Sequence, residues 1–300
     1  MGAPTAATTT SLHRPAGSAA GSGCSLLIAP ESAGWDYSGL AVVELAPGEA
    51  FTWSTGPAET LVMSLSGSCA VTCEGTTYDV QGRRDVFSGP SDFVYVPRDA
   101  ELTVTSDDGG RFALPSAVCD QRLPVRYQPA DAVPVELRGA GTASRQVNNF
   151  CTPDAFEAVA LIACEVLTPS GNWSSYPPHK HDEASAEESV LEEIYYFEVA
   201  DGPAGPGLGY QRVYGHGDRE IDVLAEVRSG DVVLIPHGWH GPSMAVPGYD
   251  LYYLNVMAGP GDERAWHICD DPAHGWVRET WADQAVDPRL PFGSRPEVAR

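Results

Sequence analysis

Two histidines separated by one residue, His179 and His181, form the pattern in this chain that most directly indicates chemistry. A β-strand projects residues i and i+2 from the same face, so both imidazoles would point at one spot. Farther along the chain stand Glu193, which opens an apolar run, and His240, which closes the turn after the apolar run 231–235. Three imidazoles and one carboxylate suit Zn, Mn, Fe or Ni. We therefore predict that these four residues hold one divalent metal ion per chain, with Zn or Mn expected and Fe or Ni as alternatives.

Other residues compete for these roles. Two histidines on a strand can also be ordinary solvated side chains, and His237 could replace His240 as a ligand. His237 lies between a proline and a glycine, which favours an exposed turn residue. Glu192 competes with Glu193, but alternation places the two on opposite faces of a strand. The position of Glu193 directly before an apolar aromatic run favours it as the ligand.

The amino-acid composition limits the kinds of fold and binding partner that this chain can have. The chain has 300 residues, 43% of them hydrophobic, which is enough for a full core and for one large or two smaller β-domains. It carries 18 Lys and Arg against 41 Asp and Glu, a formal charge of −23. This charge argues against nucleic acid or an anionic membrane as a partner, and an anionic substrate would need a local cationic pocket. Exposed sheet edges would make a homo-oligomer plausible.

The segment 1–23 is rich in Ala, Thr, Gly and Ser and has no apolar stretch. It predicts a disordered tail rather than a secretion signal. No stretch reaches the roughly 20 apolar residues that span a bilayer. The seven cysteines include no CxxC pair, which is typical of reduced thiols. Together these features predict a cytoplasmic protein.

Short apolar runs broken by Gly, Pro, Asp or Ser recur through most of the chain. Together with 31 Gly and 25 Pro, they predict an all-β fold of antiparallel barrels or sandwiches. Helical signals are few and short, at 154–159 and from Ser185 onward.

An internal repeat divides the chain. Residues 92–97 parallel 231–236, and the run from Glu59 resembles the run from Glu193, but no His-x-His precedes Glu59. We infer two barrels of common design, of which the first lacks the metal ligands. The expected parts are a disordered tail (1–23), an N-terminal barrel (24–150), a metal-binding C-terminal barrel (151–285) and a C-terminal tail (286–300).

These motifs resemble the cupin superfamily, whose first motif has His-x-His followed by Glu and whose second runs Gly-x5-Pro-x-Gly and then His. The second motif stands here at 230–240. A narrower resemblance joins four blocks in order: 177–182, 191–197, 209–214 and 249–260. In these blocks the chain looks like the 5-deoxy-glucuronate isomerases of bacterial inositol catabolism, over about residues 24–285. Four matching blocks are far more specific than one motif.

The resemblance implies a bicupin of two tandem jelly-roll barrels that isomerises a small uronate. The reaction would convert 5-deoxy-D-glucuronate into 5-dehydro-2-deoxy-D-gluconate through a cis-enediol. A divalent ion would act as Lewis acid and template, and a base would move the C2 proton to C1.

Arg212 is the candidate for binding the substrate carboxylate, with Tyr210 on the same face of its strand. If that face is solvated, Arg212 is instead a surface arginine paired with an acid. Asp250, Tyr252 and Tyr253 are the candidates for proton handling, although tyrosines in strands usually pack in a core. The residues alone do not settle which of them is the base.

Three rival functions remain open at this level. One is the related 5-keto-4-deoxyuronate isomerase of pectin breakdown. Another is a metal-dependent cupin dioxygenase, because a site of three His and one Glu also serves oxygen chemistry. The third is a non-catalytic sugar-binding or regulatory cupin, against which the intact ligands of the second half argue.

Overall fold

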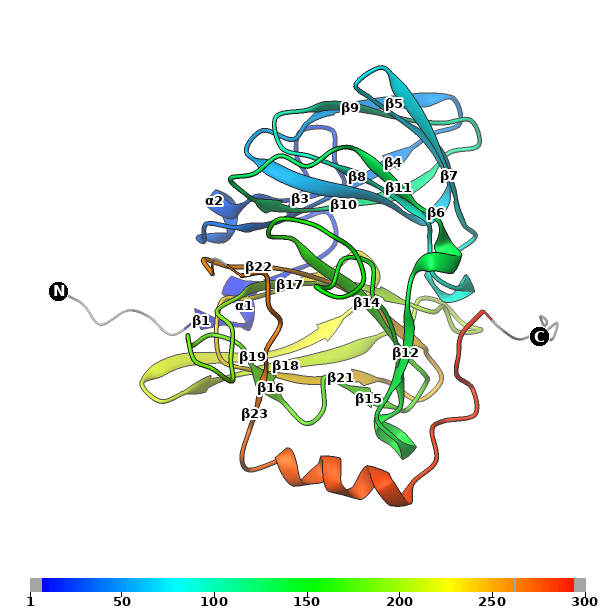
Figure 1. Cartoon of the computed structure of the whole chain (residues 1–300). Helices are drawn as coiled ribbons and strands as arrows, with labels where there is room; N and C mark the ends of the chain where they lie inside the picture. The colour runs from blue at the N-terminus through cyan, green and yellow to red at the C-terminus, as the bar shows by residue number, and fades with distance from the viewer. Residues whose placement is uncertain (1–6, 262, 294–300) are drawn as a thin grey trace.

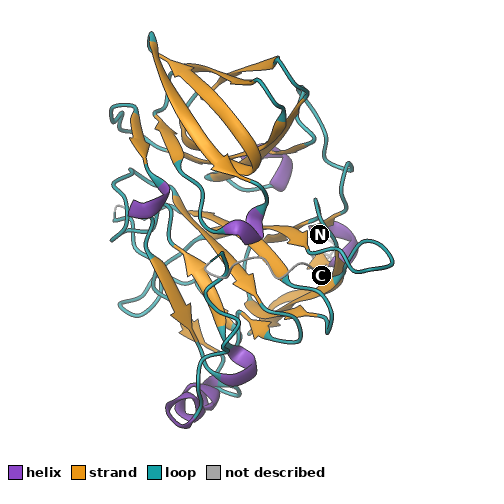
Figure 2. Ribbon diagram, turned by 90° about the vertical axis from the view of Figure 1, so that its right-hand side faces the viewer, coloured by secondary structure: helices purple, strands orange, loops and turns teal. Residues whose placement is uncertain are grey.

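A computed structural model describes residues 7–261 and 263–293, which form two all-β barrels packed one on the other (Figure 1). Within these residues one nine-stranded sheet makes the first barrel, and two seven-stranded sheets make the second. The few helices are short and lie between or beside the sheets (Figure 2). The predicted all-β class with two tandem barrels is confirmed. No helix of the described residues is long and apolar enough to cross a membrane.

Apolar residues of the first barrel pack into two different cores. Its strands are β3 (Leu26–Ile28), β4 (Ser38–Leu45), β5 (Glu49–Ser54), β6 (Ala58–Cys73), β7 (Thr76–Arg83), β8 (Phe93–Val96), β9 (Glu101–Ser106), β10 (Gly110–Val118) and β11 (Arg126–Gln128). On β6, Val62 and Val71 point into the barrel, whereas Leu61 and Met63 join the core shared with the second barrel. Helices α2 (Pro30–Ala33), η1 (Val86–Ser88) and η2 (Ala130–Ala132) connect strands.

The second barrel encloses the predicted metal ligands between two sheets. One sheet runs in the order β12 (Val135–Arg138), β13 (Arg145–Asn148), β14 (Ile162–Thr168), β22 (Leu251–Ala258), β17 (Glu192–Val199), β20 (Val232–Ile235) and β2 (His13–Arg14). The other contains β1 (Ala7–Thr8), β19 (Arg219–Val227), β18 (Gly209–His216), β21 (Trp239–Ala245), β16 (His179–Lys180) and β23 (Cys269–Asp270), with β15 (Trp173–Ser174) paired to β21. Helix η3 (Gly141–Ala143) precedes β13, and η4 (Gly275–Asp283) follows β23.

The chain ends differ from the sequence-based expectation. Strand β1, helix α1 (Thr9–Leu12) and strand β2 lie in the predicted disordered tail, yet β1 pairs with β19 and β2 with β20. Backbone pairing with the second barrel therefore orders this segment, a long-range contact that local composition does not reveal. At the other end the Phe292 N–H donates to Gln146 Oε1 at 2.7 Å. Residues 1–6 and 294–300 of the predicted tails lie outside the described residues.

The border between barrels also falls earlier than predicted. Strands β12 and β13 pair with each other and with β14, so they belong to the second barrel although they precede residue 151. The expected helix at 154–159 is a turn, and the segment after Ser185 is a series of bends. The helix η4, which sequence reasoning missed, lies at the outer end of the second barrel (Figure 1).

Strand register corrects the predicted repeat by one residue. Thr60 lies opposite Val96 in the first barrel, and Glu193 lies opposite Ile235 in the second. Because Val96 and Ile235 each precede the repeated proline, the counterpart of Glu193 is Thr60. Glu59 therefore corresponds to Glu192, and the one-residue slip changes the face of every side chain.

Glu59 and Glu192 make equivalent contacts, because the carboxylate of each binds backbone N–H groups of the other half of the chain. Glu59 accepts hydrogen bonds from the backbone N–H groups of 159–161, at 2.6 to 3.0 Å. Glu192 accepts hydrogen bonds from the N–H groups of 36–38, at 2.8 to 2.9 Å. Each carboxylate thus holds the segment that leads into the first long strand of the other barrel, β14 or β4. Hydrogen bonds to a charged acceptor are among the stronger ones in proteins.

A buried ion pair also joins the barrels. Both terminal nitrogens of Arg83 donate to the Glu165 carboxylate at 2.8 Å, and the two side chains are 3% and 0% exposed. The Asn148 amide donates to the same carboxylate at 2.7 Å. Removal of one partner would leave the other charge buried and unpaired.

We expect Arg83→Leu to lower the free energy of unfolding by about 3–5 kcal/mol in urea denaturation, because Glu165 loses its counter-charge. The double variant Arg83→Leu/Glu165→Leu should recover most of that loss. In the control Arg228→Ala, which breaks the exposed pair with Glu226, the loss should stay below about 1 kcal/mol. A loss for Arg83→Leu no larger than that of the control would contradict the assigned role.

Candidate metal centre and its cavity

Three strands bring the predicted ligands together inside the second barrel. His179 begins β16 and lies directly opposite His240 of β21 in the antiparallel ladder. His181 follows β16 on the same side of the chain as His179. Glu193 enters from the start of β17, which belongs to the facing sheet. The site therefore draws on both sheets of the barrel.

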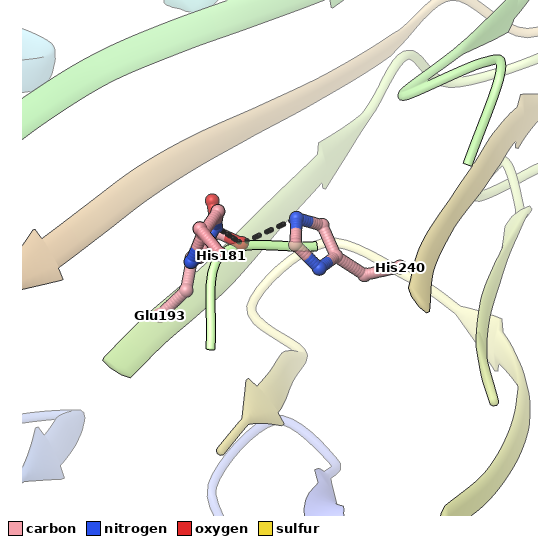
Figure 3. Close-up of side chains that lie close together, drawn as sticks. All are labelled: His181, Glu193 and His240. Carbon is pink, nitrogen blue, oxygen red and sulfur yellow. Dashed lines mark hydrogen bonds and ion pairs between the residues drawn. The ribbon is translucent and has the colours of Figure 1, made fainter. Parts of the chain in front are cut away.

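His181, Glu193 and His240 form a compact group (Figure 3). One carboxylate oxygen, Glu193 Oε2, lies 3.2 Å from His181 Nε2 and 3.1 Å from His240 Nε2. The three ligand atoms all lie within 4.8 Å of one another, and the three side chains are at most 2% exposed. Such a group can surround one small cation.

His179 stands beside this group. Its ring centroid is 4.4 Å from that of His240 and 6.5 Å from that of His181. It falls outside the 4.8 Å group of three, and it also lines a cavity. The structure thus brings three of the four predicted ligands into direct contact range and places the fourth beside them, in the lining of the cavity.

Each imidazole is oriented in the way that metal-binding histidines usually are. The Nδ1 atoms of His179, His181 and His240 lie 3.4, 3.3 and 3.2 Å from the backbone carbonyls of Pro177, Leu191 and Gly238. With Nδ1–H donated to these carbonyls, Nε2 of a neutral ring carries the lone pair that can bind a cation. On His181 and His240 that nitrogen faces Glu193. Second partners of this kind fix both tautomer and ring orientation at metal sites.

The protonation of the group follows from burial and from Glu193. Burial, together with the nearby His181, lowers the pKa of His179 to about 3. Burial also holds the pKa of His240 well below its usual value. Burial alone would lower the pKa of His181 as well, but the Glu193 carboxylate outweighs it and the pKa is raised. The imidazoles of His179 and His240 are thus neutral at neutral pH, the form in which imidazole binds metals.

One buried atom lacks a partner that a cation would supply. His240 Nε2 is fully buried and, although 3.1 Å from Glu193 Oε2, has no hydrogen bond of acceptable geometry among the described residues. A buried polar atom without a partner is costly. Both this atom and the mixed imidazole and carboxylate donor set fit a divalent ion.

The other oxygen of the carboxylate is also held. Asn255 on β22 donates its amide N–H to Glu193 Oε1 at 2.7 Å, and Asn255 is 4% exposed. This bond orients Glu193 so that Oε2 faces the two imidazoles. Sequence reasoning did not single out Asn255, and its position three residues after Tyr252 carries no motif of its own.

A cavity of about 520 Å³ opens beside the group of ligands. Its lining includes His179, Ser175, Tyr195, Tyr253 and Asn255. The rest of the lining comes from β12 and β13, which belong to the same sheet as β17 and β22, and from the segment that carries η4. These residues include Glu136, Arg138, Arg145, Trp266, Arg278 and Trp281. The volume is within the range of small-molecule sites.

Three hydroxyl groups form a chain in this cavity. Ser175 Oγ lies 2.9 Å from the Tyr195 hydroxyl and 3.0 Å from the Tyr253 hydroxyl, and the two rings stack at 4.6 Å. Ser175 has a left-handed backbone, with φ of 44°, a conformation that non-glycine residues adopt mainly where the surroundings enforce it. Gly241 allows it, since a Cβ there would lie 1.8 Å from the Ser175 carbonyl oxygen. Burial raises the pKa of both tyrosines, so they stay protonated and can donate hydrogen bonds.

Arg212 and Tyr210 lie away from this cavity, which corrects the predicted substrate-binding pair. On β18 the buried residues are Gln211 and Val213, so the face that carries Tyr210 and Arg212 is the outer one. Arg212 donates to the exposed Asp222 and to backbone carbonyls, and its side chain is 31% exposed. It is the surface arginine of the alternative interpretation.

Of the three residues predicted for proton handling, Tyr253 alone reaches the cavity. Tyr252 points to the opposite face of β22, where its ring lies 5.8 Å from the Arg83 guanidinium between the barrels. Asp250 precedes β22 and accepts a hydrogen bond from the Ser170 N–H at 2.8 Å, which holds a turn. Both predictions are therefore wrong, because alternation reverses the face of Tyr252 and Asp250 stands at the far end of the strand from Glu193.

We expect His181→Ala to lose the metal, because the remaining group no longer surrounds a cation. Elemental analysis should fall from about one ion per chain to near zero. His237→Ala, in the turn before β21 and outside the three-residue group, is the matched control and should keep its metal. If the His181→Ala protein retained one metal ion per chain, the group of His181, Glu193 and His240 would not be the metal site.

Asn255→Leu should weaken metal affinity about 10- to 100-fold, because Glu193 loses the bond that orients it. Competition against a chromogenic chelator measures this change. Asn172→Leu removes an equally buried asparagine that bonds Ser144 and Asp287 instead, and its affinity should match the wild type. Equal affinities for all three proteins would show that the Asn255 contact does not support the site.

Comparison with known proteins supports the same assignment of fold and family. The model of the KduI/IolB family matches residues 12–277. A protein of Geobacillus kaustophilus named 5-deoxy-glucuronate isomerase is 42% identical over 258 residues, covering 84% of this chain and 90% of that protein. The Bacillus subtilis protein of the same name is 39% identical over 246 residues, covering 81% and 88%.

Solved structures agree. An IolB-like protein from Salmonella typhimurium superposes with a TM-score of 0.81 at 35% identity, covering 89% of this chain and 98% of that one. An oxalate decarboxylase of Lactobacillus farciminis has a TM-score of 0.58 at 12% identity, covering 81% and 82%, which supports the two-barrel fold alone. The family match over most of the chain and the identity to its members lead to one conclusion: this chain belongs to the KduI/IolB family.

Proposed function

We propose that this protein is a metal-dependent aldose-ketose isomerase that converts 5-deoxy-D-glucuronate into 5-dehydro-2-deoxy-D-gluconate in myo-inositol catabolism. The observation that carries the proposal is the group of His181, Glu193 and His240 beside a cavity of about 520 Å³. A six-carbon sugar acid fits a cavity of this size. Relatives 36–42% identical to this chain are named 5-deoxy-glucuronate isomerase, which supports this choice of substrate.

The divalent ion would be held by His181, Glu193 and His240, with His179 as the fourth ligand. Zn or Mn is the proposed ion, since borderline and hard cations both accept imidazole and carboxylate. When bound, such an ion supplies Lewis acidity that polarises a carbonyl and lowers the barrier to loss of the neighbouring proton.

The reaction moves two protons, one from C2 to C1 and one from the C2 oxygen to the C1 oxygen. A base removes the C2 proton while the aldehyde oxygen gains a proton, and the electrons form the C1–C2 double bond of a cis-enediol. A proton then returns at C1 as the C2 hydroxyl loses its proton and becomes the carbonyl. The protonated hydroxyls of Tyr253, Ser175 and Tyr195 can donate to sugar oxygens as charge builds on them. Tyr253 therefore stays our candidate for proton handling. Glu136 is a carboxylate in the lining of the same cavity, where Arg138 lowers its pKa and keeps it ionised.

The setting of the reaction is also a proposal. We infer a cytoplasmic protein that binds a small uronate and neither nucleic acid nor membrane. The formal charge of −23 and seven cysteines without a disulfide support this interpretation. We also propose that the protein assembles into a homo-oligomer, because its sheets have edge strands that favour association.

The decisive experiment is an anaerobic assay of purified protein, stripped of metal and reloaded with Zn or Mn, on 5-deoxy-D-glucuronate. We expect stoichiometric ketose, detected by NMR, and an unchanged rate in air, because isomerisation needs no oxygen. In D₂O, deuterium that enters the product at the former aldehyde carbon would report transfer through exchange with solvent.

Other outcomes point to the rival functions. Conversion of 5-keto-4-deoxyuronate in preference to 5-deoxy-D-glucuronate would assign the pectin-pathway reaction. Oxygen consumption with a flavonol or thiol, without ketose formation, would assign a dioxygenase. Sugar binding without any turnover would leave a binding protein.

A further inference from the structure

Arg145 is a buried arginine at the wall of the cavity. It lies on β13, is 7% exposed, and lines the same cavity as His179, Ser175 and Tyr253. Its Nη1 donates to the backbone carbonyls of Ala143 at 3.1 Å and Tyr176 at 3.5 Å. Its guanidinium carbon also lies 5.5 Å from the centre of the Trp281 ring.

Arg145 differs from its two cationic neighbours in having no acidic partner among the described residues. Arg278 donates from Nε and Nη2 to both oxygens of Asp270, and Arg138 donates to Glu136 at 2.8 Å. A buried cation without a counter-charge is unfavourable unless an anion reaches it. Burial lowers the pKa of Arg145 to about 10, so it remains charged at neutral pH.

The local backbone is shaped to seat this guanidinium. Gly139 has φ of +72°, and a Cβ at this position would lie 2.7 Å from Arg145 Nη1 and 2.2 Å from the Ala143 carbonyl oxygen. The turn between β12 and β13 therefore requires glycine for two reasons: its backbone conformation and the close approach of the arginine. Backbone acceptors occupy Nη1, whereas Nε and Nη2 have no hydrogen-bond acceptor among the described residues.

We propose that Arg145 binds the carboxylate of the uronate and so selects acid sugars over neutral ones at this site. The inference rests on the proposed function and replaces Arg212 in that role. An open-chain substrate has its carbonyl at one end and its carboxylate at the other. With the carbonyl end beside His179, the carboxylate end can reach Arg145, which lines the same cavity. The planar fork of a guanidinium matches a carboxylate through two parallel hydrogen bonds.

The kinetic test compares two sugars that differ at C6 alone: 5-deoxy-D-glucuronate, with a carboxylate, and 5-deoxy-D-glucose, with a hydroxymethyl group. Arg145→Met should raise KM for the uronate about 100-fold with a smaller change in kcat, and leave kcat/KM for the neutral sugar unchanged. Arg145→Lys, which keeps the charge but loses the fork, should raise KM about 10-fold. The matched control Arg212→Met should equal the wild type. An unchanged KM in Arg145→Met, or an equal loss for both sugars, overturns the proposal.

A binding experiment separates this inference from the proposed reaction. Calorimetry with D-glucuronate and D-glucose on metal-free protein reports recognition of the carboxylate without any turnover. We expect the wild type to bind glucuronate more tightly than glucose, and Arg145→Met to lose that preference. This result would support the role of Arg145 even if no isomerase activity were found. Equal binding of the two sugars by the wild type, or a preference that survives in both Arg145 variants, would refute it.

Discussion

The register of β17 between β20 and β22 is the constraint on which the site depends. Glu193 lies opposite Ile235 on one side and Met257 on the other, and this pairing turns its carboxylate toward the imidazoles of β16 and β21. A shift by one residue would bring Glu192 inward and send Glu193 toward the first barrel. The same register brings Asn255 beside Glu193, so the candidate ligand and the residue that orients it come from one strand pairing.

The two barrels use equivalent positions for different purposes. At the position of Glu193 the first barrel has Thr60, which donates to the Pro115 carbonyl. At the position of Glu192 it has Glu59, and both carboxylates bind backbone N–H groups of the other half. The contact that joins the barrels is thus common to both, whereas the second barrel alone has a glutamate, Glu193, at the position of the candidate ligand. With Arg83 and Glu165 buried at the junction, the first barrel acts as a support for the sheet that carries Glu193.

Local spacing allowed the histidines to be predicted because each signal is short in sequence. His179 and His181 share a face by simple alternation. His240 follows a strand and a turn that the local sequence indicates directly. Arg212 shows the limit of the same reasoning. Alternation groups it with Tyr210, but the burial of Gln211 and Val213 decides that this group faces outward. Tyr252 and Tyr253 are separated in the same way, one toward Arg83 and the other toward Ser175.

The sequence by itself determined the all-β class, the two-barrel repeat and which histidines and glutamate were candidates for a metal site, because these depend on periodicity and on motifs a few residues long. Tertiary structure alone decided which side chains share the cavity with them. Arg145 reaches it through the pairing of β13 with β14, and Arg278 and Trp281 return to it from η4, over 100 residues later. Likewise, β1 and β2 are ordered by strands more than 200 residues away. Such contacts depend on strand pairing over long range and on which face of each strand is inward, neither of which a local pattern records.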